Sequence, residues 1–517
     1  MKFVSDPDIA VKIAQMKRRV CWQEKLISDK AIAQTKLVID DADTDNPNFS
    51  FLVIGDSGSG SHLRYEPQRQ IAEMMLQEES RFVLHTGDVV YQVGSKEYYQ
   101  QNFIAPYREF LVGGEKHKQL AYDRLTFRKP FFLVPGNHDY YDLPLIYGVL
   151  VQATWLPRRL LRGRIDLDVG WHGSHQGEAY ARAFLDYLTE IKNSGNLNQH
   201  LDQYYTAKHT GDRCLQYQPE KFTRLPNRYY TFRYGGIDFF ALDSNTFNDP
   251  LAIPDTEEGA DRRKQLLIRQ SQLTEQEQKI QNAIDQLDPD DSDDAEQIDD
   301  YYAKLEHIAE SQRDIEKQLN QQQQMTDWEQ LNWFKSSLIT SWQDENVRGR
   351  VVFFHHPPYV TEATKWDQGQ TLAVRARLRQ VFDEAAAEIG ALPEGRSIVD
   401  LVLSGHAHCL EHLQTKDTGH ADSHIDWIVC GGSGHSLRRQ REEGTVLYQD
   451  ADLNSQPIGQ SHLYVGRNGD RRNHKRPYSF LRIDVQAGNK PKFTVNPLVA
   501  EWHQRQWHEY AINPFVI

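Results

Sequence analysis

Five short apolar stretches, each followed at once by Asp, Asn or His, constrain this chain more than any other feature. They read FLVIGD at 51–56, FVLHTGDVVY at 82–91, FFLVPGNHD at 131–139, VVFFHHPP at 351–358 and LVLSGHAH at 401–408. Apolar runs of this length, punctuated by Gly or Pro, predict buried strands. Because open α/β sheets place their ligand sites beyond the ends of such strands, we expect the five polar tips to meet in space.

Length, charge and cysteine content narrow the class of protein. A chain of 517 residues exceeds the usual single core, so one large domain with insertions, or two domains, is expected. The formal net charge of -14 argues against a general nucleic-acid binder, which needs a basic face. A small anionic substrate remains compatible with this charge, because metal ions can supply positive charge locally.

The cysteines and the N-terminus bear on the compartment. The four cysteines lie apart and form no C-x-x-C pair, so they predict neither a zinc knot nor a disulfide framework. The N-terminus carries Lys and Arg without an apolar h-region, and no stretch approaches the ~18 apolar residues of a membrane span. We therefore expect a soluble, cytoplasmic protein without a membrane span.

The order of the predicted elements divides the chain into an arm, a main domain and two insertions. Residues 1–48 are polar with helical periodicity and predict an N-terminal helical arm. Residues 49–517 form the main domain, in which strands and helices alternate as in a layered sheet. An insertion rich in Arg, Tyr and His interrupts this alternation at 145–222, and either a cap over the site or a surface excursion fits its composition.

The second insertion, 256–325, predicts an antiparallel helical hairpin. One arm repeats an apolar residue every seven positions and the other at alternating three- and four-residue spacings. The acidic turn DPDDSDD at 288–294 separates the two arms. We expect the apolar seam to be buried within the hairpin itself. Assembly of a homo-oligomer through 256–325 is the alternative.

The polar residues at the strand tips suit two metal ions. Hard and borderline cations prefer carboxylate, amide oxygen and imidazole ligands, and the tips offer these without a thiolate. The candidates are Asp56, Asp88, Asn137, His355, His406 and His408. The two imidazoles of a His-x-His pair splay to either side, so His406 and His408 can serve different metals, with Asp88 placed to bridge them. Two metals roughly 3.5–4 Å apart clamp the attacking and leaving oxygens of an in-line displacement, as in phosphoester hydrolysis.

The ordered set GD, GDxxY, GNHD, HHPP and GHAH resembles the calcineurin-like metallophosphoesterase superfamily, over about 50–254 and 326–485. This resemblance implies a four-layer α/β/β/α sandwich of two mixed sheets, here with helical insertions. Two details are similar to the purple acid phosphatase branch. The general pattern opens with Asp-x-His, but Asp56-Ser57-Gly58 lacks that histidine, and Tyr91 stands three residues after Asp88. In that branch the two changes go together, because a tyrosine phenolate replaces the imidazole on iron(III).

The resemblance also implies how the ligands divide. One metal ion would take Asp56, Tyr91, His408 and bridging Asp88, and the other Asp88, Asn137, His355 and His406. His355 is preferred to its neighbour because the family ligand stands two residues before the proline of the motif.

The resemblance assigns further residues to the substrate side. His138 matches the position that protonates or hydrogen-bonds the leaving oxygen, and Asp139 would orient a neighbouring imidazole. His356 is left as a candidate substrate contact. His435, in the Gly-rich turn GGSGH at 431–435, is a second candidate.

Together these observations predict a metal-dependent phosphoester hydrolase, most simply a phosphomonoesterase, with a metal-activated hydroxide as nucleophile. The expected cofactors are Fe(III) and a divalent Fe, Zn or Mn ion, and the expected substrate is a small phosphoester rather than a nucleic-acid polymer. A nucleotide phosphodiesterase using the same site is the nearest alternative. A binding or assembly module that works through the helical hairpin is the alternative from another class.

Overall fold

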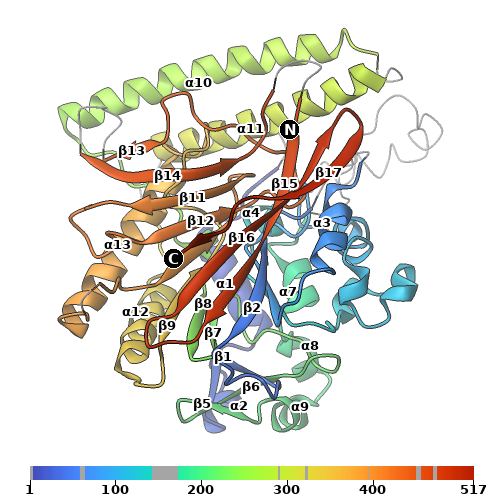
Figure 1. Cartoon of the computed structure of the whole chain (residues 1–517), viewed down its shortest axis with the longest axis vertical. Helices are drawn as coiled ribbons and strands as arrows, with labels where there is room; N and C mark the ends of the chain where they lie inside the picture. Colours follow the sequence, from blue (N-terminus) through green and yellow to red (C-terminus); the bar gives the residue numbers. More distant parts are fainter. Residues whose placement is uncertain are drawn as a thin grey trace.

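The computed structural model describes residues 4–58, 65–142, 173–288, 292–320, 324–393, 395–449, 456–469 and 474–517. Two mixed β-sheets lie face to face, and helices cover their outer sides (Figure 1). The predicted α/β fold with two mixed sheets is therefore confirmed.

The larger sheet has eleven strands. Their order is β13 (Val446–Tyr448), β14 (Pro457–Val465), β11 (Leu410–Thr415), β12 (Asp426–Cys430), β10 (Leu401–Ser404), β9 (Gly349–Phe353), β8 (Ile237–Ala241), β7 (Tyr230–Tyr234), β1 (Ile32–Ile39), β6 (Asp212–Tyr217) and β5 (Ala207–His209). Strands β8, β9, β10 and β12 run parallel, so the chain leaves β9 and β10 at the same edge of the sheet. The HHPP and GHAH motifs follow these two strands and therefore lie side by side.

The smaller sheet has seven strands. Six follow the order β17 (Gln506–Ala511), β16 (Lys492–His503), β15 (Arg476–Gln486), β2 (Phe49–Ile54), β3 (Phe82–His85) and β4 (Phe131–Leu133), and β18 (Phe515–Val516) pairs with β16. Strands β2, β3 and β4 are parallel, with Ile54 opposite His85 and His85 opposite Leu133. This register brings the three following motifs to one edge.

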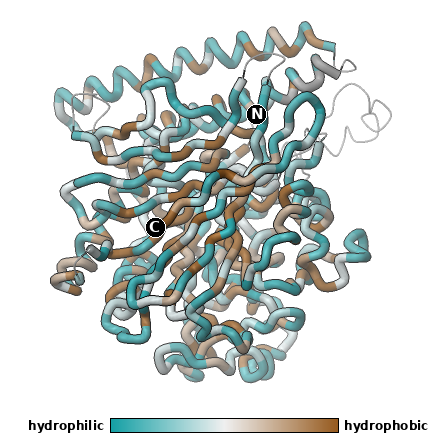
Figure 2. The backbone as a smooth tube through the Cα atoms, in the orientation of Figure 1, coloured by the Kyte–Doolittle hydropathy of each residue, from teal (hydrophilic) through white to brown (hydrophobic). Residues whose placement is uncertain are grey.

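Aromatic side chains fill the space between the sheets. Phe51 and Phe82 of the smaller sheet stack with ring centroids 5.3 Å apart, and Phe82 meets Phe239 of the larger sheet edge-on at 5.4 Å. Offset-stacked and edge-to-face pairs of this kind stabilise a core beyond the apolar area they bury. The hydrophobic strands lie at the centre of the molecule in Figure 2. This shared core fixes the position of both sheet edges relative to each other.

Helices form the two outer layers. Helices α12 (Trp328–Gln343) and α13 (Gly369–Ile389) pack on the outer face of the larger sheet, against residues such as Phe240 and Val402. Helix α3 (Pro67–Met75) contacts β15 and β16 of the smaller sheet. The layers thus run helix, sheet, sheet, helix. Shorter helices follow between β4 and β5: α4 (Asn137–Tyr140), α7 (Glu178–Phe184), α8 (Leu188–Asn193) and α9 (Leu197–Tyr204).

The N-terminal 48 residues differ from the expected helical arm. They hold helices α1 (Ile9–Arg19) and α2 (Lys25–Asp29), but then strand β1, which lies between β7 and β6 in the larger sheet. The polar residues of β1 interrupt the apolar pattern that identifies a strand, so the sequence did not predict it. Gln34 is buried because its amide accepts from Gln23 N and donates to Val20 O.

The first predicted insertion, 145–222, is partly outside the described residues, which resume at 173. Its described part contains α7, α8 and α9, and then β5 and β6 at the end of the larger sheet. This part therefore extends the sheet as well as adding helices.

The second insertion forms two long helices, α10 (Glu257–Ile284) and α11 (Ser292–Asn320). They lie side by side along one end of the molecule, beyond β13 and β14 (Figure 1). Their apolar seam is formed by Leu266, Leu273, Ile308 and Ile315, with Ile280 and Leu319 partly buried beside it.

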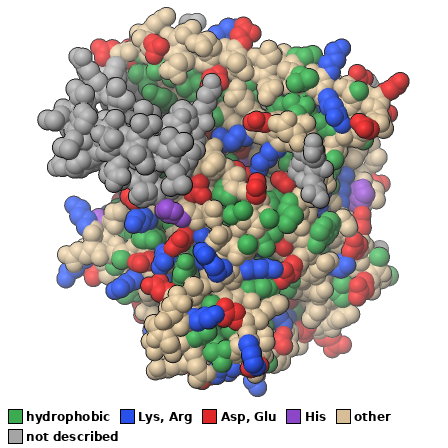
Figure 3. All heavy atoms as spheres, turned by 180° about the vertical axis from the view of Figure 1, so that it is seen from behind, with side chains coloured by type: hydrophobic (Ala, Val, Ile, Leu, Met, Phe, Trp, Pro, Cys, Tyr) green, Lys and Arg blue, Asp and Glu red, His purple; other side chains and the backbone are tan. Residues whose placement is uncertain are grey.

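The surface of the molecule carries charges of both signs. On the face shown in Figure 3, Lys and Arg side chains are interspersed with Asp and Glu side chains. Among the helices that the structure describes, none combines the length and the apolar character that crossing a bilayer requires.

Candidate metal centre

Four predicted ligands occupy an unusual backbone conformation just past the strand ends. Asp56, Asp88, His406 and His408 have φ values of 52°, 55°, 68° and 46°. Residues other than glycine reach this left-handed region at a cost of about 1–3 kcal/mol, and such residues cluster at functional sites. The sharp turns place the four side chains at the shared sheet edge, where all are buried.

A glycine lets the third motif approach the second. A Cβ on Gly136 would lie 2.1 Å from Asp88 Oδ1 and 2.3 Å from Asp88 N, so a larger residue would separate the loops. The close approach allows His138 N to donate to Asp88 Oδ1 at 2.8 Å. The Asp88 carboxylate is therefore held by the loop that also carries Asn137.

The first half of the centre converges on the Tyr91 hydroxyl. Tyr91 Oη lies 2.9 Å from Asp56 Oδ1, 2.8 Å from Asp88 Oδ2 and 3.1 Å from His408 Nε2. His408 Nδ1 donates to Ser436 O at 3.1 Å, which turns Nε2 toward the centre. The four residues predicted for one metal ion are thus brought together.

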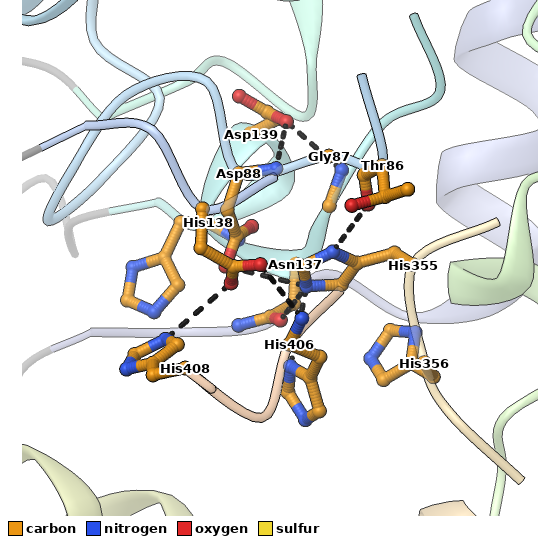
Figure 4. A network of polar contacts seen from close by, with 12 residues as sticks. Thr86, Gly87, Asp88, Asn137, His138, Asp139, His355, His356, His406 and His408 are labelled. Atoms are coloured by element: carbon orange, nitrogen blue, oxygen red, sulfur yellow. Dashed lines mark hydrogen bonds and ion pairs between the residues drawn. The ribbon is translucent and has the colours of Figure 1, made fainter. Parts of the chain in front are cut away.

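The second half converges on His355. His355 Nε2 lies 2.9 Å from Asn137 Oδ1, 3.3 Å from Asp88 Oδ2 and 3.2 Å from His406 Nδ1. His355 Nδ1 donates to Thr86 O at 2.8 Å, so the inward Nε2 can offer a lone pair. Figure 4 shows these side chains pointing toward Asp88 from separate loops. The second predicted ligand set therefore also meets.

The donor set fits two cations. Carboxylate, amide and phenol oxygens and imidazole nitrogens are buried here within contact of one another, and buried groups of this kind need compensating partners. Two triads, Asp56 with Asp88 and His355, and His355 with His356 and His406, each place one ligand atom per residue within 4.8 Å of the others. The described residues are therefore consistent with a dinuclear His/Asp site.

The pKa shifts of the buried groups show that the centre calls for positive charge. Burial raises the pKa of Asp56 to about 6. Burial lowers the pKa of His355, but Asp88 and Asp56 outweigh it and raise that pKa to about 9, so a proton compensates the carboxylates. Burial, together with Asp56 and Asp88, raises the pKa of Tyr91 well above its usual value. Tyr91 would therefore ionise only if a cation offset these two carboxylates.

His356 lies beside the centre with both ring nitrogens engaged. Its Nδ1 is 2.8 Å from Ser244 Oγ and its Nε2 is 3.2 Å from Asn248 Nδ2. The ring is fully buried against His406, with centroids 4.4 Å apart. This placement favours a supporting position over direct contact with a substrate, although His356 as a substrate residue stays a prediction.

His138 and His435 both pack against the Tyr91 ring, and their own ring centroids are 6.4 Å apart. The His435 ring stacks on Tyr91 at a centroid distance of 3.8 Å, and the His138 ring is 4.2 Å away. His138 Nδ1 donates to Gln92 O at 2.5 Å, which leaves Nε2 facing the other way. Both imidazoles thus border the half of the centre that contains Asp56.

Asp139 holds backbone rather than an imidazole. Its carboxylate accepts from Gly136 N at 2.9 Å, Asp88 N at 3.1 Å and Val89 N at 3.2 Å. The expectation that it orients a neighbouring imidazole is not what this geometry shows. The position two residues after Asn137 points back into the GDVVY loop, so Asp139 fixes the backbone that presents Asp88.

Two glutamates at the centre were not expected from the sequence. Glu306 and Glu310 of α11 reach His435 Nε2 at 3.0 Å and His406 Nε2 at 3.2 Å, respectively. In the sequence, the only sign of this role is that two acidic residues lie four positions apart on the predicted helix. In a segment so rich in acids this spacing cannot be told from a solvated helix face.

A comparison with protein families agrees with the motifs. The calcineurin-like phosphoesterase family model matches residues 49–410. The chain belongs to this family. No curated protein matches the chain.

Solved structures with a similar arrangement are distant in sequence. A Plasmodium protein described as "GAP50 the anchor in the inner membrane complex" is 12% identical with a TM-score of 0.36, over 90% of this chain and 89% of that one. Purple acid phosphatase PPD1 from yellow lupin (Lupinus luteus) seeds is 13% identical with a TM-score of 0.36, over 91% of this chain and 53% of the lupin chain. A structure of PhoD is 12% identical with a TM-score of 0.39, over 92% and 70%.

Proposed function

We propose that this phosphoesterase-family protein is a metal-dependent phosphoester hydrolase, and most simply a phosphomonoesterase acting on a small substrate. The observation that carries the proposal is the convergence of Asp56, Asp88 and His408 on the Tyr91 hydroxyl. With the cluster around His355, it provides two adjacent sets of ligand atoms that share Asp88. Such a pair suits an in-line displacement at phosphorus.

The expected cofactors are Fe(III) beside Tyr91 and a divalent Fe, Zn or Mn ion beside Asn137. Asp56, Asp88, Tyr91 and His408 would hold the first ion, and Asp88, Asn137, His355 and His406 the second. When bound, such ions lower the pKa of water to about 7 and stabilise negative charge on phosphoryl oxygens. The buried phenol of Tyr91 suits the ferric site, because a tyrosinate needs a strong cation to offset Asp56 and Asp88.

The chain itself contributes orientation and a proton. The hydrogen bond from His138 Nδ1 to Gln92 O fixes its ring, so that Nε2 of the doubly protonated ring would be the atom that gives a proton to a leaving oxygen. The hydrogen bond from the backbone N–H of His138 to Asp88 Oδ1 ties the backbone of this residue to the shared carboxylate. His435, whose ring stacks on Tyr91, is proposed as a second contact to the substrate.

Purified protein tests the proposal directly. We expect two metal ions per chain by metal analysis, a visible tyrosinate-to-iron absorption band, and hydrolysis of para-nitrophenyl phosphate faster than of its bis-ester. Preference for the bis-ester would indicate a phosphodiesterase instead. A colourless protein active with manganese would reject the iron assignment and leave the hydrolase, whereas no hydrolysis of either ester by metal-loaded protein would reject the enzyme.

A matched pair of tyrosine variants isolates the ligand. Tyr91→Phe is expected to remove the visible band, because it deletes the proposed phenolate. Tyr99→Phe is the control: Tyr99 is equally buried, and its hydroxyl has no hydrogen-bond partner among the described residues. It should keep both band and activity. A band that persists in Tyr91→Phe would contradict Tyr91 as the iron ligand.

A cytoplasmic location is part of the same proposal. It is supported by Cys21, Cys214, Cys409 and Cys430, all of which are buried and free. Free thiols agree with a reducing compartment.

A further inference from the structure

Helix α11 forms one wall of the candidate metal centre. Glu306 and Glu310 are one helical turn apart, so both carboxylates lie on the same side of the helix. Glu306 is buried and the Glu310 side chain is only 13% exposed. The hairpin therefore places two negative charges beside a centre whose ligands come from other elements.

Polar contacts along α11 fix this helix against the rest of the protein. Near its start, Asp300 pairs with Arg467 and with Arg476, the latter at 3.1 Å. Near its end, Lys317 Nζ lies 2.7 Å from Asp6 Oδ2. Asp314 accepts from Gly369 N at 2.9 Å and from the following backbone N–H at 3.0 Å, at the start of α13. The glutamates are thus held in place from outside the hairpin.

Glu310 meets the outer nitrogen of a predicted metal ligand. Its Oε1 lies 3.2 Å from His406 Nε2, while His406 Nδ1 faces His355 on the inside of the centre. Lys365 Nζ and Gln370 Nε2 donate to the same oxygen, Glu310 Oε1, and Gln370 Nε2 also lies 3.1 Å from His406 Nε2, so the carboxylate is held at the oxygen that faces the ring. A carboxylate that accepts from the outer nitrogen of a ligating histidine orients the ring and strengthens it as a ligand.

Glu306 meets the two imidazoles that border Tyr91. Its Oε2 lies 3.0 Å from His435 Nε2, and its Oε1 lies 3.6 Å from His138 Nε2. The Glu306 carboxylate therefore lies between two rings that both pack against Tyr91. Without it, both rings would lose their charged neighbour on this side.

We propose that α11 is a permanent part of the active centre and that Glu310 and Glu306 are its positioning residues. Glu310 holds His406 in the orientation that binds the divalent ion, and Glu306 holds His435 and His138 beside the substrate. The inference rests on the proposed dinuclear site. It assigns to the second insertion a role inside the centre in place of a role in assembly.

Metal retention tests Glu310 independently of hydrolysis. Purified holoprotein is exposed to a fixed excess of EDTA, and loss of the divalent ion is followed by metal analysis. We expect Glu310→Ala to lose the ion about 10–100-fold faster than the parent, the usual effect of removing such a partner. Glu310→Gln keeps the size and one acceptor oxygen and should fall between them. Glu316→Gln, on the exposed side of the same helix, should match the parent.

Steady-state kinetics test Glu306. Glu306→Ala should lower kcat for para-nitrophenyl phosphate about 10-fold, with KM changed less than about twofold, because ring orientation matters most in the transition state. Glu306→Gln retains an oxygen that accepts from His435 and should recover part of the loss. A purely structural role would not give this recovery at unchanged thermal stability, so unfolding midpoints are measured alongside.

Three outcomes would overturn the proposal, and a fourth would overturn the proposed function alone. Metal loss from Glu310→Ala at the parent rate would overturn the role of Glu310. A kcat that rises in Glu306→Ala would show that α11 obstructs the centre, and an unchanged kcat would show no role for Glu306; both overturn the proposal. If the parent hydrolyses no phosphoester, the proposed function fails, yet the EDTA measurement still tests Glu310.

Discussion

The two helices of the hairpin are nearly equal in length but differ in what they contact. Helix α10 has 28 residues and α11 has 29. The buried residues of α10 are Gly259, Leu266 and Leu273, and both leucines belong to the seam. Helix α11 buries seam residues on one side and, on the other, polar residues that include Glu306, Asp314 and Gln318. Helix α10 buries its apolar residues mainly against α11. Helix α11 also buries polar residues against the rest of the protein.

This difference shows which residues determine how the hairpin packs on the rest of the protein. The apolar repeat specifies that two helices pair, but it is equally present in both, so it does not say which one faces the core. That choice is made by polar residues whose partners are far away in sequence. Asp314 meets the start of α13, and Asp300 meets Arg467 and Arg476. Buried polar groups are stable only with such partners, so α11 fits in one orientation.

The largest expected effect on stability concerns the anchor at the end of α11. Asp6 Oδ1 lies 2.6 Å from Lys12 Nζ and Oδ2 lies 2.7 Å from Lys317 Nζ, and the Lys12 side chain is only 1% exposed. Asp6→Asn would leave the Lys12 ammonium buried without a counter-charge. We expect the free energy of unfolding in urea to fall by about 3 kcal/mol.

The control for this anchor is on α10. Asp261 is exposed, so Asp261→Asn should change the free energy of unfolding by less than about 0.5 kcal/mol. Equal effects of the two substitutions would show that α11 is no better anchored than α10. That result would remove the distinction between the helices.

The same anchor predicts a pH dependence. Burial would raise the pKa of Asp6, but Lys12 and Lys317 outweigh it and hold that pKa well below its usual value of about 3.9. A carboxyl with a lowered folded-state pKa stabilises above its unfolded pKa and loses this contribution as the pH falls. The stability gap between parent and Asp6→Asn should be constant above about pH 5 and narrow below about pH 4. A gap that widens on acidification would contradict this account.

The sheet and the metal centre follow from the sequence because their signals are local. Each of the five motifs couples an apolar strand to its own polar tip, and parallel pairing of β2, β3 and β4 brings the tips together by register. The missing Asp-x-His histidine made Tyr91 a candidate, and the structure places its hydroxyl among Asp56, Asp88 and His408.

Other parts were not predictable because their signals depend on distant residues. Strand β1 carries Gln34 at a buried position, which is acceptable only because Val20 and Gln23 supply hydrogen bonds. Asp139 was expected to meet an imidazole but accepts from backbone N–H groups of the neighbouring loop. Glu306 and Glu310 could not be told from solvated acids before α11 was placed against the centre.

A smaller effect separates the seam from the outer surface of the hairpin. Ile308 of α11 is 3% exposed and Ile268 of α10 is 51% exposed. Ile308→Val removes one buried methylene and should reduce the free energy of unfolding by about 1 kcal/mol. Ile268→Val removes the same group from an exposed position and should change it by less than about 0.5 kcal/mol. Comparable losses would mean that the outer face of α10 is covered in solution.

The smallest expected effect concerns the start of α10. Thr256 Oγ1 accepts from Gly259 N at 3.2 Å and caps the helix. Thr256→Ala should weaken the first turn by about 1 kcal/mol, seen as faster hydrogen exchange there. Because the first seam residue, Leu266, lies more than two turns further on, fraying should stop before it, and exchange near Glu306 should be unchanged. Faster exchange near Glu306 would show instead that α10 helps to hold α11 against the metal centre.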